Sequence, residues 1–313
     1  MTATAPDSAP APSHSKALLL VAFATVYVVW GSTYLAIRIG VEHWPPLWMA
    51  AVRFAIAGGG LYAVLRLRGA PAPGPRAWLA ATLVGGLMLG GGNGTVCWAE
   101  QWVPSGETAL ILAAGPLWTV LLPWIFRRAS APRPLVALGV VVGLVGVGVL
   151  IGGGGHAPGA TGVDRALLLG RLSLLVASLS WVTGSLIQHR LPLPKAPALA
   201  TAMEMVAAAP LLGLAAAAHG DLAHFHFAAI PGRSWLALAY LIVFGSLAGF
   251  GSYVYVLVHA GPTRASTGAF VNPLIAVVLG AALAGEPMTA RTAVAAAMII
   301  AAVAGVILGT ARR

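Results

Sequence analysis

The chain has 313 residues, of which 59% are hydrophobic and only 8% are charged, and its mean hydropathy is +0.88. A soluble chain carries about 25% charged residues, most of them on its surface. This chain therefore lacks the charge to cover a water-facing globule, and most of its exterior must face lipid. The formal net charge of +10 comes from basic residues that sit singly or in pairs between apolar runs rather than on one face, which favours a role in membrane orientation over nucleic-acid binding.

Ten apolar runs are long enough to cross about 30 Å of hydrocarbon as helices, which takes roughly 20 residues each. In chain order they are 17–37, 46–67, 77–98, 105–126, 134–152, 167–188, 197–218, 233–257, 264–284 and 289–310. Prolines and glycines mark the breaks between these spans. Residues 1–16, rich in Ala, Pro, Ser and Thr, are predicted to form a disordered cytoplasmic tail rather than a cleaved signal peptide.

The second half of the chain repeats the first half. Three pairs of segments correspond in the same order: Trp30–Thr33 with Trp181–Ser185, Leu110–Leu117 with Thr267–Leu274, and Gly148–Gly152 with Gly305–Gly309. We therefore predict two copies of one unit, residues 17–152 and 167–310, joined by a connector at 153–166. Five spans per copy is an odd number, so the second copy enters the membrane upside down. The predicted fold is an all-α integral membrane protein of ten transmembrane helices in two inverted five-helix repeats, an arrangement typical of secondary transporters.

The distribution of Lys and Arg predicts the orientation of the chain. If the N-terminus is inside, the cytoplasmic segments hold 12 of these residues and the outer segments hold 5, with Arg53 left within span 2. This bias predicts that both termini lie in the cytoplasm of a multi-pass protein.

Several short segments resemble those of one transporter family. They are Trp30–Tyr34 in span 1, Ala51–Phe54 in span 2, Trp102–Gly106 before span 4, Val271–Leu274 in span 9 and Gly285-Glu286 after it. In order and spacing they resemble the drug/metabolite transporter superfamily, specifically its ten-helix EamA-type permeases, over residues 17–310. The resemblance implies a bacterial inner-membrane exporter or exchanger of amino acids or similar metabolites. The chain departs from the family pattern at Glu107, where an apolar residue is expected, and at Ala129, the repeat position of Glu286.

Proline and polar residues inside the spans predict a central cavity. Pro116 in span 4 and Pro273 in span 9 each remove a backbone hydrogen bond, and in lipid the freed carbonyl must face protein, water or substrate. A packing kink is the alternative for either proline alone. Trp30 and Trp181 lie well inside their spans, whereas aromatic residues near span ends are usually interface anchors. The residues predicted to line the substrate cavity are Trp30, Tyr34, Asn93, Trp98, Pro116, Trp181, Ser185, Tyr253, Asn272 and Pro273.

Four ionisable residues are predicted to gate this cavity. Arg53 corresponds to Glu204 at the repeat offset, and Glu107 corresponds to Arg264. Charges inside a membrane are costly, which favours a functional role. We therefore expect Arg53 to pair with Glu107 at the outer side and Glu204 with Arg264 at the inner side. The alternatives are a helix-dipole effect for Glu107 and an ordinary inside-positive charge for Arg264.

Other features of the sequence limit the possible functions. His219, Asp221, His224 and His226 crowd one outer loop, where a solvated loop is favoured over a metal site. The glycine-rich stretches lack the sequence of a phosphate-binding loop, so neither ATP nor any other cofactor is expected. No acid–base or nucleophilic cluster indicates an enzyme. The expected partners are a small-molecule substrate and the lipid bilayer, and the sequence leaves open a counter-transported proton or solute. The protein is expected to be a monomer or a homodimer.

The leading hypothesis is thus a secondary transporter, an exporter or exchanger of small metabolites such as amino acids, that works by alternating access through a central cavity. The alternative is a lipid flippase or scramblase, or another non-enzymatic membrane protein.

The topology yields a first testable prediction. A reporter that is active only in the cytoplasm should be active when it is fused after Arg313, and one that is active only in the periplasm should be inactive there. The reason is that ten spans return the chain to the side of the membrane where it began. Periplasmic activity of the same fusion would require an odd number of spans and would contradict the inverted repeat.

Overall fold

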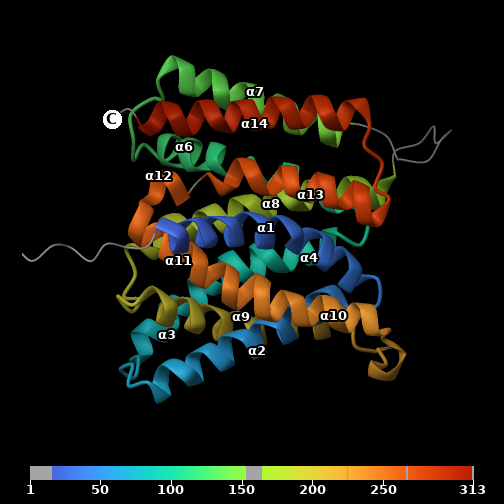
Figure 1. Cartoon of the computed structure of the whole chain (residues 1–313). Coiled ribbons are helices and arrows are strands. Elements are labelled where there is room, and N and C mark those ends of the chain that lie inside the picture. The colour runs from blue at the N-terminus through green and yellow to red at the C-terminus, as the bar shows by residue number, and fades with distance from the viewer. Residues whose placement is uncertain (1–15, 153–163, 224, 266, 312–313) are drawn as a thin grey trace, which may run out of the picture.

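The computed structural model describes residues 16–152, 164–223, 225–265 and 267–311. Within these residues the chain is helical throughout (Figure 1). The first repeat contains α1 (Lys16–Val41), α2 (Pro46–Leu67), α3 (Pro75–Gly85), η1 (Gly86–Gly94), α4 (Thr95–Ala99), α5 (Ser105–Leu112), α6 (Gly115–Ile125) and α7 (Pro134–Ile151). The second contains α8 (Arg165–Gln188), α9 (Pro197–His219), η2 (Phe227–Ala229), α10 (Gly232–Tyr240), η3 (Leu241–Ala248), α11 (Gly249–Ala260), α12 (Pro262–Ala265), α13 (Gly268–Ala284) and α14 (Ala290–Ala311).

The helices account for ten membrane crossings. Nine helical segments among the described residues are long and apolar enough to span a membrane, and Gly268–Ala284 is a shorter apolar helix. Helices α1 and α8, which begin the two repeats, run in opposite directions through the bundle (Figure 1). The predicted ten-helix membrane fold is therefore confirmed. Of the predicted tail, only Lys16 lies within the described residues, and residues 153–163 of the predicted connector lie outside them.

Local sequence explains where most of these helices begin. Helices α2, α3, α7 and α9 each have a proline in the first turn. Proline is tolerated there because the first N–H groups of a helix have no intrahelical acceptor. Helix α8 begins instead with an Asp cap, in which Asp164 accepts hydrogen bonds from the backbone N–H of Ala166 (3.0 Å) and of Leu167 (3.2 Å).

Span 9 differs from its predicted bounds. Gly261 has a φ of 83°, which ends α11, and the short α12 separates it from α13. Span 9 therefore begins at Gly268 rather than at residue 264, and Arg264 lies in the connection before it. The sequence placed Arg264 in span 9 because the apolar run continues through this turn, and a left-handed glycine there is not evident from hydropathy.

Three spans are irregular near the middle of the bundle. Span 4 breaks at Ala113 and Ala114, just before Pro116, as a proline without an N–H predicts. Spans 3 and 8, which correspond between the repeats, each contain a π-helical stretch, η1 and η3. Such stretches are rare and often occur at functional sites. The sequence analysis did not predict them.

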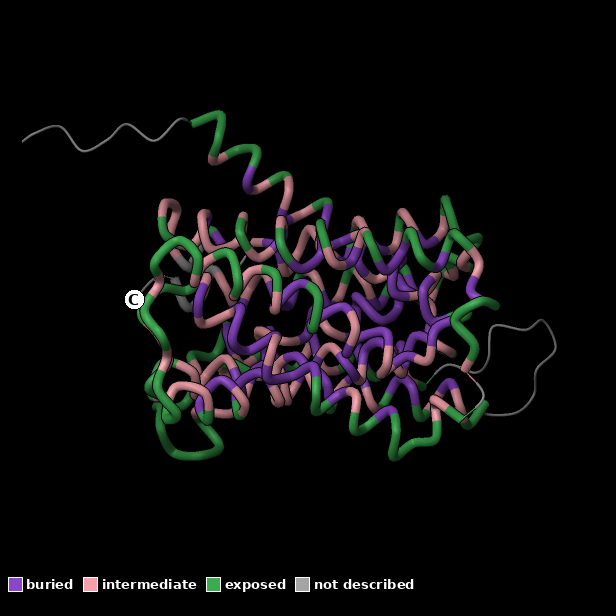
Figure 2. Tube along the Cα trace, turned by 90° about the horizontal axis from the view of Figure 1, so that it is seen from below, coloured by how far each residue is buried: buried purple, intermediate pink, exposed green. Residues whose placement is uncertain are grey.

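The bundle is buried at its centre and apolar on its outside. Figure 2 shows the buried residues running through the middle of the bundle, with exposed residues around it. Large apolar side chains are exposed on the exterior, among them Leu20, Leu67 and Leu214. Such a surface is expected for helices that face lipid tails. Helices α2 and α9 pack closely along one edge of the bundle, and α7 and α14 pack along the opposite edge (Figure 1).

Two adjacent glycines in α2 provide a test of this packing. A Cβ added to Gly58 would lie 2.5 Å from the Cβ of Met205 and 2.9 Å from the backbone nitrogen of Val206, both in α9. A Cβ added to Gly59 would meet nothing within 4 Å. We expect Gly58→Ala to destabilise the protein by about 1–3 kcal/mol through overpacking. Gly59→Ala should be neutral or slightly stabilising because alanine is the better helix former.

Thermal unfolding of the two purified variants in detergent, compared with the parent protein, measures the difference. Equal melting temperatures for the two variants would show that α2 and α9 do not pack as described.

Candidate substrate cavity

A cavity of about 190 Å³ lies between the two repeats. It is smaller than the roughly 300–1,000 Å³ of pockets for drug-sized ligands, so its size suits a small metabolite. Both irregular π-helical stretches contribute to its wall, as expected where non-standard backbone borders a cavity. The wall is formed by Trp30, Thr33, Tyr34, Ile37, Arg53, Gly92, Asn93, Val96, Leu112, Gly115, Ala177, Ser178, Trp181, Val182, Gly245, Phe250 and Asn272.

Two tryptophans at corresponding repeat positions face this cavity. The Trp30 indole contacts the ring of Tyr253, with centroids 5.1 Å apart, and the ring of Phe250 at 5.4 Å. Its Nε1 donates a hydrogen bond of 3.3 Å to the carbonyl of Gly245 in η3. Trp181 packs closely against Gly92 in η1, where an added Cβ would lie 3.1 Å from the indole. Each tryptophan is thus held against a π-helical stretch of the other repeat.

Arg53 is the charged residue of the cavity wall. Its side chain is buried, its Nε donates to Ser246 Oγ at 2.9 Å, and its Nη1 donates to Asn93 Oδ1 at 3.4 Å. The guanidinium also lies 5.0 Å from the centre of the Phe54 ring. No carboxylate among the described residues lies within ion-pair distance of it. A positive charge is thus held by neutral oxygens beside the cavity, with hydrogen-bonding capacity to spare.

Asn272 contributes an unsatisfied acceptor on the side of α13. Its Oδ1 is buried and has no hydrogen-bond partner in the structure. Buried polar side chains are normally hydrogen-bonded, so an unpaired amide oxygen in a cavity wall suits a polar ligand.

The structure brings together some of the predicted cavity residues but not all. Trp30, Tyr34, Asn93, Trp181 and Asn272 line the cavity. The remaining five lie outside its wall: Trp98, Pro116, Ser185, Tyr253 and Pro273. The ring of Tyr253 packs against that of Trp30, and Trp98 packs against Trp102 with ring centroids 4.8 Å apart.

Several wall residues were not predicted, although a signal for some was present. Thr33 and Ile37 follow Trp30 at helical spacing and extend its face of α1, and Val182 adjoins Trp181. Leu112 and Gly115 are exposed to the cavity by the break in span 4, which only the structure locates.

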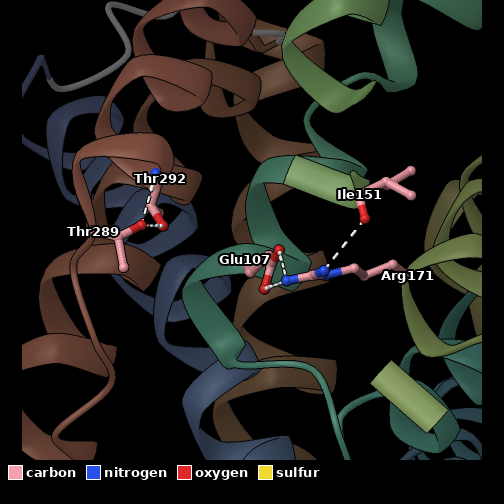
Figure 3. A network of polar contacts seen from close by, with 5 residues as sticks. All are labelled: Glu107, Ile151, Arg171, Thr289 and Thr292. Carbon is pink, nitrogen blue, oxygen red and sulfur yellow. Dashed lines mark hydrogen bonds and ion pairs between the residues drawn. The ribbon is translucent and has the colours of Figure 1, made fainter. Parts of the chain in front are cut away.

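Glu107 has a different partner from the one predicted. Its carboxylate accepts from Nη2 of Arg171 at the start of α8, with distances of 2.9 Å to Oε1 and 3.2 Å to Oε2 (Figure 3). Arg171 Nη1 also donates to the carbonyl of Ile151 at 3.3 Å. The predicted pair of Glu107 with Arg53 is therefore not formed in this conformation. Glu107 comes from the first repeat and Arg171 from the second, and the packing of α5 against α8 brings the two side chains together.

The second predicted gate is also not formed. Glu204 is buried in α9, where its backbone carbonyl lies against Gly85 of α3, whereas Arg264 is exposed in α12. No ion pair joins the two among the described residues. In this conformation Arg264 lies in α12, in the connection before α13, and the inner gate stays a prediction for another conformation.

Three glutamates gather at one end of the bundle, which we call the carboxylate end. Glu286 accepts hydrogen bonds from the backbone N–H of Ser105 (2.7 Å) and of Gly106 (3.0 Å), and so caps the N-terminus of α5. Glu107, in the first turn of the same helix α5, forms its ion pair with Arg171 of α8. Glu100, which follows α4, is fully buried, and Arg38 of α1 donates to its backbone carbonyl.

The carboxylate end is packed more tightly than the opposite end. In span 4, seven consecutive residues of α5, Ser105–Ile111, are buried, whereas Leu117 is the buried residue of α6. In span 8, α10 and η3 together have six buried residues, whereas in α11 the buried residues are Gly249 and Val256. The cavity is thus sealed at the carboxylate end and more loosely covered at the other.

The histidine loop shows a simple local interaction. His219 Nδ1 lies 2.6 Å from Asp221 Oδ1, with the histidine side chain mostly exposed. Within the described part of the chain no group of three or more His, Cys, Asp or Glu side chains is placed to hold a metal. His224 lies outside the described residues.

Comparison with known proteins assigns the family. The EamA-like transporter family matches the chain twice, at residues 16–152 and 168–308. The chain belongs to the EamA-like transporter family. The two matches agree with the internal repeat, and they identify the protein as a membrane transporter.

Relatives of known name extend this result. The chain is 40% identical over 290 residues to "Uncharacterized inner membrane transporter YedA" of Escherichia coli strain K12, covering 92% of this chain and 90% of that protein. It is 25% identical to "Probable amino-acid metabolite efflux pump" of Salmonella typhimurium, over 88% of this chain and 90% of the pump. It is also 25% identical to "Probable terminal-alkyne amino-acid exporter" of Streptantibioticus cattleyicolor, over 85% of each chain. A solved crystal structure with 22% identity and a TM-score of 0.57 covers 95% of this chain and 99% of its own, and it supports the fold.

The buried ion pair yields a stability prediction. Replacing Glu107 by Gln removes the countercharge of a guanidinium that is only 2% exposed. Leaving one buried charge without its partner costs about 3–5 kcal/mol in soluble proteins. We expect Glu107→Gln to lower the melting temperature in detergent strongly.

Glu42→Gln is the matched control, because Glu42 pairs with Arg233 at a solvent-exposed site. It should change the melting temperature little. Equal effects of the two substitutions would contradict a buried pair.

Proposed function

We propose that the protein moves a small amphipathic solute that carries a carboxylate, such as an amino acid or a related metabolite, by alternating access. The observation that carries this proposal is Arg53, a buried guanidinium in the cavity wall that donates hydrogen bonds to the neutral oxygens of Ser246 and Asn93. A carboxylate can accept two parallel hydrogen bonds from a guanidinium, which gives both affinity and orientation.

The rest of the wall suits the remainder of such a solute. Trp30 and Trp181 offer apolar faces, and Asn272 offers an unpaired acceptor to an ammonium or amide donor. The names of two relatives, an amino-acid metabolite efflux pump and an amino-acid exporter, support the same solute class.

The shape of the bundle supports alternating access. The cavity lies between two repeats of opposite orientation, and the helices beside it are more fully buried toward the carboxylate end than toward the other end. In transporters of this plan, rocking of one repeat against the other exchanges which end is open. With both termini in the cytoplasm, the carboxylate end is the outer end, and this conformation faces inward.

A transport assay tests the role of Arg53. In proteoliposomes, uptake of amino acids should exceed uptake of their amides and of the corresponding amines, which lack the carboxylate. Arg53→Gln should reduce amino-acid uptake by about 10- to 100-fold, because hydrogen bonds to charged groups contribute about 1.5–3 kcal/mol. Arg53→Lys should retain part of the activity.

Arg233→Gln serves as the control, because Arg233 is an exposed arginine far from the cavity wall. If Arg53→Gln transports amino acids as the parent does, or if amides and acids are transported equally, the guanidinium does not bind a carboxylate.

A further inference from the structure

Glu100 is a buried carboxyl group that the proposed solute site does not use. It follows the last residue of α4 and is 0% exposed. Neither of its carboxyl oxygens has a hydrogen-bond partner among the residues that the structure describes. A buried ionised carboxylate without a partner is so unfavourable that such groups take up a proton instead.

The surroundings of Glu100 favour the neutral form. Burial raises the pKa of this carboxyl well above its ordinary value, and the nearby charge of Glu286 raises it further, whereas Arg38 acts in the opposite direction. The Arg38 guanidinium, however, donates to the backbone carbonyl of Glu100. The one nearby cation is therefore engaged with a neutral oxygen of the same residue.

The other ionisable groups around α4 do not neutralise Glu100. On α1, Tyr34 faces it from the cavity wall, and Cys97 lies one turn earlier on α4 itself. On α8, Arg171 binds Glu107, and on α2, Arg53 binds Ser246 and Asn93. Among the described residues, Glu100 thus has a second carboxylate nearby, and no cation forms an ion pair with its side chain.

The position of Glu100 links it to the sealed end of the cavity. Its backbone N–H donates to the carbonyl of Val96, a wall residue one turn earlier. Tyr34 and Ile37, on the facing side of α1, also line the cavity. Glu100 therefore lies at the carboxylate end, about one helical turn beyond the cavity wall. Any motion that opens this end must bring water to it.

We propose that Glu100 is a proton-binding site that must be occupied for the carboxylate end to close, so that the transport cycle is coupled to protons. The inference rests on the alternating access proposed above. When the end is open, the hydrated carboxyl has its ordinary affinity for protons and is ionised at neutral pH. When the end closes, water is excluded and the carboxyl retains a proton.

The sign of the pH effect follows from linkage. The closed state binds the proton more tightly than the open state, so acid favours closing. As the pH rises above the ordinary carboxyl value of 4.5, the closed state loses stability relative to the open state, until the pH passes the raised pKa. Each unit between the two pKa values changes the closing equilibrium about tenfold.

A labelling experiment on the purified protein tests this without any transported solute. In a Cys97→Ala background, a cysteine at Val103, which is 0% exposed between α4 and α5 and does not line the cavity, reports opening of this end. A cysteine at Ala218, an exposed position in α9, corrects for the pH dependence of thiol chemistry. The measured quantity is the ratio of the two maleimide labelling rates from mildly acidic to mildly alkaline pH.

With Glu100 present, this ratio should rise with pH by about tenfold or more, as the closed state is lost. In Glu100→Gln the ratio should stay low and independent of pH, because the amide remains neutral. Glu100→Met, apolar and of similar length, should behave in the same way and covers the case in which the glutamine variant does not fold. Glu42→Gln, which removes an exposed carboxylate, should keep the pH dependence of the parent.

A pH-dependent ratio in both neutral variants, or a flat ratio in the parent, would overturn the proposal. Because no solute is present, either result is separate from the uptake measurements on Arg53. A protein that transports amino acids but shows a flat ratio would retain the proposed function and lose proton coupling through Glu100.

Discussion

The absence of hydrogen-bonding solvent in the hydrocarbon core is the constraint on which the structure depends. Inside lipid, each backbone N–H and C=O must be satisfied by the chain itself, so irregular backbone is tolerated only where it borders protein or a cavity. This chain concentrates its irregular backbone at one place. The π-helical stretches η1 and η3 and the break at Ala113 and Ala114 all lie beside the cavity between the repeats. The rule that keeps the outer helices regular thus also locates the site.

The same constraint governs the buried acidic groups, and the carboxylate end shows three solutions. Glu107 is neutralised by Arg171 from the other repeat. Glu286 lies on the N-terminus of α5, where backbone N–H groups and the helix dipole stabilise a negative charge. Glu100 has neither form of compensation, which leaves protonation as its means of remaining buried. The first two arrangements hold the end together, and the third makes its closure sensitive to pH.

The repeat explains part of the cavity, and its asymmetry explains the remainder. Trp30 and Trp181 occupy corresponding positions and contribute matching walls. Arg53 corresponds to Glu204, so the guanidinium has no second copy, and one side of the cavity is positive. Glu286 corresponds to Ala129, so the cap on α5 exists only at the carboxylate end. A solute in such a cavity meets an oriented site, as a molecule with one charged and one apolar end requires.

The sequence by itself determined the membrane fold, the ten spans, the repeat and five of the wall residues, because hydropathy, breaker residues and helical spacing are local properties. Pro116 also marked span 4 as irregular, since a proline lacks the N–H that continues a helix, but the break at Ala113 and Ala114 was located only by the structure. Partner choice was decided only by the tertiary structure. Arg171 and Arg53 are equally basic in the sequence, but only the packing of α5 against α8 brings one of them to Glu107. Likewise, the charges that act on Glu100 come from Arg38 and Glu286, residues in two distant segments that only the tertiary structure brings together.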